Sequence, residues 1–229
     1  MRKIPVIFIL IYFFGGISFA QSNFKPSFQA VIKGGISFPL GDGYFKNSFG
    51  AFPTALAEIG CNVTSHLQAY GNVSYDMISS KVSSEFGHGL IEYLNSKQLS
   101  FSIGTKFYIR IPEKKVRFFG DVGVGFYSFS PGDTVYEEEV PGNIELTISN
   151  SSYSQFGVNF GGGSEFFIGR KLFLNFSLKY HYIFKKNNIE AVRNLTYRTS
   201  GELNQSIEYV FNAPGRKYIQ FSAGLGYTF

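Results

Sequence analysis

The sequence predicts an all-β fold in which eight antiparallel strands, in up-and-down order, close into a transmembrane β-barrel. Three observations lead to this prediction. The last twelve residues alternate between apolar side chains and polar or glycine ones. Seven further segments show the same period of two, and the connections alternate between short and long. Because a strand turns successive side chains to opposite faces, each segment has one apolar face and one polar face.

The first four expected strands cover residues 28–38, 53–63, 67–77 and 98–110. In each of them, apolar side chains alternate with polar or glycine residues. The alternating apolar positions are Phe28, Ala30, Ile32, Ile36 and Phe38; Ala55, Ala57, Ile59, Cys61 and Val63; Leu67, Ala69, Val73, Tyr75 and Met77; and Leu99, Phe101, Ile103, Phe107 and Ile109.

The last four expected strands cover residues 116–128, 156–168, 172–183 and 218–229. Their apolar positions are Phe118, Val122, Val124 and Phe126; Val158, Phe160, Phe166 and Ile168; Leu172, Leu174, Phe176, Leu178, Tyr180 and Tyr182; and Ile219, Phe221, Ala223, Leu225, Tyr227 and Phe229. All eight segments are longer than the ~5–6 residues usual in soluble strands. Their length instead suits a tilted strand that crosses a bilayer in about 9–11 residues.

The connections alternate in length along the chain. The short ones are residues 64–66, 111–115 and 169–171, and the long ones are 39–52, 78–97, 129–155 and 184–216. Short periplasmic turns and long extracellular loops are typical of outer-membrane barrels, and this order puts both chain ends on the short-turn side. Composition alone does not decide, because 18% aromatic residues and 26 glycines also fit a soluble β-sandwich.

Residues 1–20 have the features of a secretory signal peptide: a basic start, an apolar run over 4–14 and the cleavage site Ser18-x-Ala20. An uncleaved anchor helix is the alternative, but the apolar run is shorter than the ~20 residues that a span needs. We therefore expect a cleaved signal peptide, export through the inner membrane, and one barrel domain over 21–229 in the cell outer membrane.

The C-terminal segment and the loop rhythm together suggest a family. The last strand ends on an aromatic residue, Phe229. In this it resembles the closing strand of bacterial outer-membrane barrels, in which a terminal aromatic residue serves as an assembly signal. The chain resembles the porin-like family of small outer-membrane β-barrel domains, which includes the OmpA and OmpX barrels. The resemblance implies that Leu225, Tyr227 and Phe229 form a C-terminal signal for the barrel assembly machinery. Nothing follows Phe229, so the periplasmic domain of the OmpA arrangement is expected to be missing.

In this interpretation the apolar faces contact outer-membrane lipid and lipopolysaccharide. Aromatic residues should then collect in two girdles, one at each membrane interface. The expected girdle residues are Phe28, Phe38, Tyr75, Phe107, Phe118, Phe126, Phe166, Tyr180, Tyr182 and Tyr227. The alternative is that these residues form the core of a soluble sandwich.

The opposite faces carry charges of both signs, which the barrel must enclose. The interior of an eight-stranded barrel is just wide enough for side chains, and buried charges must be paired. The expected lumen charge network is Lys33, Glu58, Asp76, Lys106, Asp121, Glu165 and Lys179. Inward glycines leave room for large inward groups such as Phe119 and Tyr127. The sequence therefore predicts a lumen plugged by side chains, without a wide pore.

The expected pairings follow from neighbouring strands. Lys33 can meet Glu58 on the next strand. If Arg110 opposes Arg117 across the connection 111–115, then Lys106 falls opposite Asp121. That register also brings the two arginines together at the periplasmic mouth, where Glu113 or water must offset them.

Enzymatic features are weak. No nucleophile, base and carboxylate fall at one level of the barrel around His181, and His66 and His88 lie in connections. We expect no catalytic residues, no cofactor and no metal site. The run 137–139 of glutamates is typical of a solvated loop. Without Arg2 and Lys3 of the expected signal peptide, 19 basic and 16 acidic residues remain, and this net charge of +3 is too small and scattered to indicate a nucleic-acid partner.

The long loops are the expected functional surface. Residues 144–148 and 206–211 alternate like strands, so hairpins could protrude beyond the membrane and offer an edge to an extracellular partner. A stiff loop without a partner is equally consistent. The expected role is structural, adhesive or surface-interactive. The alternatives are porin-like passive diffusion of small solutes and a rim enzyme that modifies lipid A.

Overall fold

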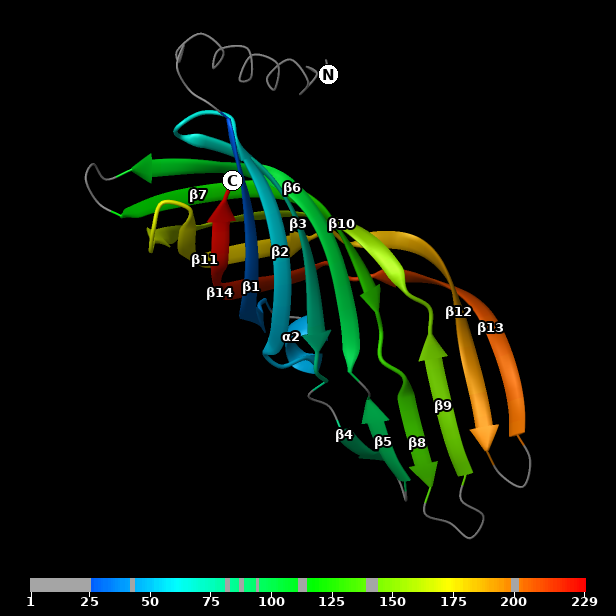
Figure 1. The fold of residues 1–229 in the computed structure, drawn as a ribbon. Helices are drawn as coiled ribbons and strands as arrows, with labels where there is room; N and C mark the ends of the chain where they lie inside the picture. The colour runs from blue at the N-terminus through cyan, green and yellow to red at the C-terminus, as the bar shows by residue number, and fades with distance from the viewer. Residues whose placement is uncertain are drawn as a thin grey trace, which may run out of the picture.

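The structure is a computed structural model that describes residues 26–41, 44–80, 83–86, 89–93, 95–110, 115–138, 144–198 and 202–229. The expected signal peptide over 1–20 lies outside these residues and stays a prediction. No helix within the described ranges is long and apolar enough to cross a membrane. The chain forms a closed barrel and a second, open sheet that extends from one end of it (Figure 1).

The barrel has eight strands, and its first and last strands close it. Pairing between β1 and β14 runs from Gln29 with Thr228 to Pro39 with Tyr218. The strands are β1 (Ser27–Pro39), β2 (Phe52–Asn62), β3 (Leu67–Ile78), β6 (Ser96–Arg110), β7 (Val116–Ser130), β10 (Tyr153–Phe167), β11 (Leu172–Ile183) and β14 (Arg216–Thr228). Every neighbouring pair is antiparallel. The predicted eight-stranded up-and-down barrel is confirmed.

The two ends of the barrel differ. At the turn end, short connections join β2 to β3, β6 to β7 and β10 to β11, and the chain ends of β1 and β14 lie there too. At the loop end, the long connections begin. Four strands extend two or three residues farther toward the loop end than predicted, because their ladders continue there; Tyr153, for example, still pairs with Phe129.

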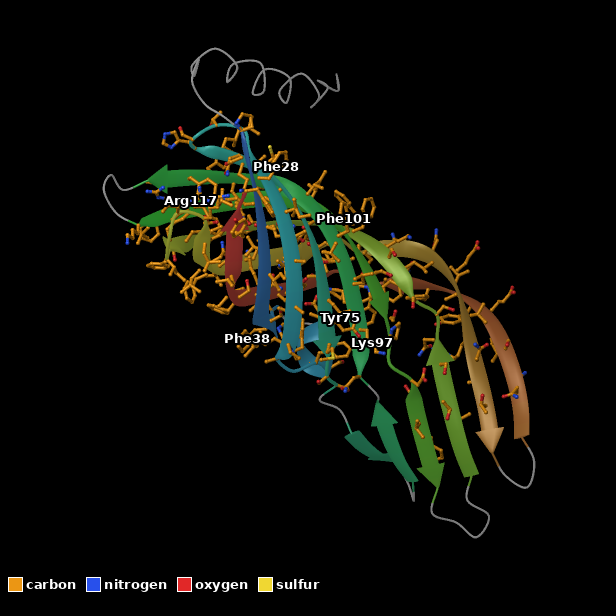
Figure 2. The ribbon with its side chains drawn as sticks, in the orientation of Figure 1. Phe28, Phe38, Tyr75, Lys97, Phe101 and Arg117 are labelled. Carbon is orange, nitrogen blue, oxygen red and sulfur yellow. The ribbon has the colours of Figure 1, made fainter. Side chains whose placement is uncertain are left out.

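The wall of the barrel is apolar outside and polar inside. Outward side chains such as Ile32 and Phe101 are 74% and 53% exposed, whereas inward Gln68 and Lys106 are at most 1% exposed. Figure 2 shows outward aromatics near both ends, with Phe28 near the turn end and Phe38 and Tyr75 near the loop end. An exposed apolar belt of this extent needs an apolar surrounding, and a bilayer provides one.

The second sheet is built from three of the loops. Its six strands have the order β13-β12-β9-β8-β5-β4. They are β4 (Ser83–Phe86), β5 (Gly89–Tyr93), β8 (Thr134–Glu138), β9 (Ile144–Asn150), β12 (Lys186–Arg198) and β13 (Glu202–Ala213). The predicted strand-like runs thus form strands. They do not stay separate hairpins, however, because β5 pairs with β8 and β9 with β12.

The β12–β13 hairpin bends close to its base. Its register shifts between Lys186 and Ile189, and Asn188 has a φ of 54°. Asparagine is among the few non-glycine residues that adopt this left-handed conformation readily. A bulge of this kind kinks and twists a hairpin, and the sheet leans away from the barrel (Figure 1).

The remaining long loop carries the short helix α2 (Tyr44–Ser48), which lies at the loop end of the barrel. The helix places Phe45 in an apolar cluster. Phe49, the first residue after the helix, belongs to the same cluster. This cluster closes the loop end.

Candidate functional site

The middle of the barrel interior holds three lysines and two carboxylates from five different strands. Glu58 forms ion pairs with Lys106 and with Lys33, whose Nζ lies 3.5 Å from Glu58 Oε2. Lys179 Nζ lies 2.6 Å from Asp121 Oδ2. All five side chains are at most 5% exposed. Each charged group therefore has an oppositely charged partner at short range, as buried charges require, and Glu58 is shared by two lysines.

Tyr70 lies at the centre of this cluster. Lys179 donates a hydrogen bond of 3.3 Å to the Tyr70 hydroxyl, which donates to Asn159 Oδ1 at 3.2 Å. The ammonium nitrogens of Lys179 and Lys106 lie 4.7 and 5.4 Å from the centre of the Tyr70 ring. The Tyr70 ring contacts both cations and stabilises them.

A fourth ion pair lies nearer the turn end. Arg117 Nε donates to Glu165 Oε2 at 2.6 Å, and its guanidinium lies 3.9 Å from the centre of the Tyr108 ring. Glu165 Oε1 also accepts hydrogen bonds from Tyr108 and Asn175. The sequence expected Glu113 or water to offset Arg117. Glu113 lies outside the described residues, so that expectation stays a prediction. Within the described ranges Glu165 offsets Arg117, because it lies directly opposite Arg117 on the adjacent strand.

The predicted register between β6 and β7 is confirmed, but it does not determine which residues form ion pairs. Lys106 lies opposite Asp121, and Arg110 lies opposite Arg117. Yet Lys106 pairs with Glu58, from β2 rather than from its neighbour β7. In so narrow a lumen a long side chain reaches across the interior as easily as along the ladder.

Asp76 differs from the other members of the predicted network. Within the part of the chain that the structure describes, it forms no ion pair. Its carboxylate accepts hydrogen bonds from Thr54 and from Gln98 Nε2, the latter at 2.8 Å. Both donors lie opposite Asp76 on the strands at its sides. The direct contacts of Asp76 are thus hydrogen bonds from neutral groups, and the charged group with which it interacts at longer range is Arg216.

His181 is connected to the same layer through Gln220 and Thr54, and its direct partners are neutral. Its ring stacks on Tyr218 with centroids 4.4 Å apart, and its nitrogens contact the Tyr127 hydroxyl at 3.0 Å and Gln220 Oε1 at 3.2 Å. None of these partners is a carboxylate or a nucleophile of a catalytic triad. The described residues also include no group of three or more His, Cys, Asp or Glu side chains placed to hold a metal ion.

An aromatic lid covers the loop end of the lumen. We define the lid as Phe45, Phe49, Phe52, Phe129 and Tyr218, none more than 7% exposed. Ring centroids of neighbouring members lie 5.3 to 6.4 Å apart. Edge-to-face and tilted contacts in this range stabilise aromatic clusters. The lid therefore separates the charged lumen from the space beneath the second sheet.

Two inward glycines accommodate bulky inward rings. A Cβ at Gly163 would lie 2.7 Å from Cζ of Phe119, and one at Gly157 would lie 2.9 Å from Cε2 of Tyr127. Any larger residue would displace these rings, because close-packed interiors tolerate little added volume. Each of these glycines thus leaves space that an inward ring fills, so this part of the lumen is occupied.

Comparisons with known proteins show the fold. No protein-family model matches the sequence, and no curated protein matches it. A major outer membrane protein from Thermus thermophilus superposes with a TM-score of 0.55 at 12% identity, over 90% of this chain and all of that one. Neisserial surface protein A, NspA, superposes with a TM-score of 0.50 at 11% identity, over 89% of this chain and 97% of that one.

The chain has the fold of the small outer-membrane β-barrels. Identities this low show the fold alone. In this outer-membrane barrel fold, the alternating apolar residues form the outer face of the wall, and the lumen and lid described above form its interior.

The predicted girdle residues lie on the outer face of the barrel. Tyr180 and Tyr182 are half-buried, because their rings pack against Phe160 and Phe184 at centroid distances of 5.0 and 5.1 Å. The other eight are 39 to 62% exposed: Phe28, Phe38, Tyr75, Phe107, Phe118, Phe126, Phe166 and Tyr227. That these residues form interfacial girdles stays a prediction.

The residues of the predicted assembly signal also face outward. Leu225, Tyr227 and Phe229 are 50, 41 and 68% exposed. The backbone N–H of Phe229 donates to Phe28 O at 2.9 Å, so the last residue is held at the seam where the barrel closes. Their role in assembly stays a prediction.

Several interior residues were not identified from the sequence: Tyr70, Tyr108, Phe173, Arg216 and Tyr218. Strand parity could have found most of them. Arg216 and Tyr218 share even numbering with inward Gln220, and Tyr108 shares it with Lys106. What parity could not show is which inward groups meet across the lumen.

Proposed function

We propose that this chain is an outer-membrane protein with a structural or surface-interaction role rather than a channel. A closed barrel anchors it, and the six-stranded sheet stands outside the cell as its interaction surface. The observation that carries this proposal is the sheet itself: three loops combine into one built element beyond a lumen that is filled and covered. In this proposal, lipid and lipopolysaccharide contact the barrel wall, and the barrel assembly machinery recognises the C-terminal strand β14.

The composition of the sheet supports an interaction surface. By register, Ile207 shares a face with Arg193, and Leu195 shares that face with Ile148. Tyr209 and Phe211 lie on the same face, two and four residues after Ile207. The face is therefore largely apolar and aromatic, unlike the solvated surface of an ordinary loop.

The edge of the sheet supplies a second point of contact. β13 is the last strand in the order, so one side of its backbone has no ladder partner within the described residues. An uncovered strand edge can add a strand from a partner protein through main-chain hydrogen bonds. A partner that supplies an extended segment fits this edge.

Passive diffusion is a weaker candidate because described side chains occupy both the middle and the ends of the interior. Ion pairs occupy its middle and turn end, and the lid covers its loop end. A rim enzyme is weaker still, since His181 lies enclosed between Tyr218 and Tyr127.

Labelling of intact cells tests where the sheet lies. In a Cys61→Ser background, Glu208→Cys on β13 should react with a membrane-impermeant maleimide, because Glu208 is exposed on the sheet. The matched control is Ser222→Cys, which faces the lumen and should not react. Reaction of Glu208→Cys only after cell lysis would refute the proposed orientation.

Liposome swelling tests the closed lumen. Vesicles that contain the purified protein should swell in isotonic sugar no faster than vesicles without protein. Swelling comparable to that of a general porin would establish the diffusion alternative instead.

A further inference from the structure

A pocket of about 490 Å³ lies between the lid and the base of the second sheet. Its walls come from both parts of the molecule: α2 and the strand ends of the barrel on one side, β12 and β13 on the other. This volume is within the range of ~300–1,000 Å³ typical of small-molecule sites. The sheet face of the proposed surface role reaches into this pocket through Arg193, Tyr209 and Phe211, but that role does not require the pocket to hold a ligand.

Arg216 lines the pocket as a buried cation with unused donors. It is 2% exposed, and Nη2 donates to Gln155 Oε1 at 3.0 Å. Its Nε and Nη1 have no hydrogen-bond partner, and no ion pair involves Arg216 within the described ranges. A buried guanidinium with two unsatisfied N–H groups is costly, and an anion would remove that cost.

The Arg216 guanidinium is held in place by aromatic rings. It lies 4.4 Å from the ring centre of Phe129 and 5.8 Å from that of Phe45. Both rings belong to the lid and also line the pocket. The cation is thus preorganised at the pocket wall rather than free to turn into solvent.

A second arginine lines the opposite wall. Arg193 on β12 donates from Nε to Asn150 Oδ1 at 3.1 Å, and its guanidinium lies 4.9 Å from the ring centre of Tyr209. Tyr209 also donates to Asn150, at 3.3 Å. Two cations line the pocket, and none of its lining residues is a carboxylate. Asp76, which interacts electrostatically with Arg216, does not line the pocket, so the charge on the lining itself is positive and suits an anion.

The rest of the lining is aromatic and hydroxylic, with Phe211 and Tyr209 on the sheet side and Phe45 and Phe129 on the lid side. Such walls favour a flat or apolar ring and offer few partners to an extended polar chain. We propose that this pocket binds a small organic anion, a carboxylate, sulfonate or phosphate joined to an aromatic ring, with the anionic group at Arg216 and the ring between lid and sheet. This goes beyond the proposed function, because it requires only the folded chain, with barrel and second sheet both in place, and no partner on the sheet.

Isothermal titration of the purified, folded protein in detergent tests the proposal. The probes are 2-naphthoate, naphthalene-2-sulfonate and 2-naphthyl phosphate, which carry one ring and three different anions. The controls are 2-naphthamide, which lacks the charge, and acetate, which lacks the ring. At least one ring-bearing anion should bind saturably, and the two controls should bind at least about tenfold more weakly. Equal binding of 2-naphthamide, or no binding of any of the three anions, would overturn the proposal.

Variants locate the site. Arg216→Gln should weaken binding of the ring-bearing anion at least about tenfold, since charged hydrogen bonds are lost. Lys217→Gln removes the neighbouring charge, which lies exposed on the outer face beside Tyr182, and should leave binding unchanged. If Arg216→Gln does not fold, Arg193→Gln serves instead, because its side chain is exposed on the sheet. Binding unaffected by Arg193→Gln and by any folded Arg216→Gln would contradict the assignment.

Discussion

At the scale of single residues, the barrel interior depends on a few shared carboxylates. Glu58 offsets two lysines at once, and Glu165 joins an arginine, a tyrosine and an asparagine. Exposed ion pairs contribute ~0–1 kcal/mol, whereas removing one partner of a buried pair costs about 3–5 kcal/mol. The carboxylates of the lumen should therefore matter far more than any charge on the second sheet.

Glu58→Gln tests this contrast. The substitution keeps the size of the side chain but leaves Lys33 and Lys106 buried without their anion. We expect the free energy of unfolding to fall by about 3–5 kcal/mol, measured by urea titration in lipid vesicles. The matched control is Glu190→Gln on β12, an exposed residue for which we expect a change within about 0.5 kcal/mol. Equal effects of the two substitutions would show that the lumen pairs contribute no special stability.

At the scale of elements, the barrel strands could be predicted because each has a period of two over its whole length. β11 begins and ends where the alternation predicts, and the inward and outward faces follow from parity alone. The second sheet could be predicted only in part. The runs that become β9 and β13 are visible in the sequence, but the pairing of β5 with β8 joins two different loops, and no local pattern specifies such a contact.

The lid shows the same limit in another form. Helix α2 has five residues, too few for a helical period to stand out in the sequence. Its phenylalanines are recognisable as buried only once the barrel mouth that they cover is known. The charged lumen could also be predicted only in part. The numbering along each strand shows which charged residues face inward, but it does not show which of them form ion pairs.

Removal of the β12–β13 hairpin tests whether the two sheets are independent elements. Lys186 pairs with Ala213 at the base of the hairpin, so an Asn-Gly turn can replace residues 187–212. We expect the shortened protein to keep the compact, heat-modifiable form on gels and to lose it at a temperature within a few degrees of the parent. All barrel ladders remain complete without the hairpin. Failure to form the compact species would show that the barrel needs the second sheet to fold.

At the scale of the whole molecule, one alternating sequence pattern produces both the apolar outer wall and the polar interior of the barrel. The same strands present apolar side chains outward and a paired, filled polar interior inward, and the loops form a sheet beyond the closed end. A soluble sandwich with this sequence would bury the outward faces between two protein layers. In the barrel those faces are the most exposed apolar surfaces of the described chain, so hydrocarbon must cover them.

The most direct test is a nuclear Overhauser experiment on isoleucine-methyl-labelled protein in lipid nanodiscs. Ile32, Ile59 and Ile103 are 74, 67 and 53% exposed on the barrel wall, whereas Ile78 and Ile183 are fully buried at the loop end. We predict cross-peaks from lipid acyl chains to the first three methyl groups and none to the last two. Absence of acyl contacts at Ile32, Ile59 and Ile103, with contacts to other protein groups in their place, would contradict the account.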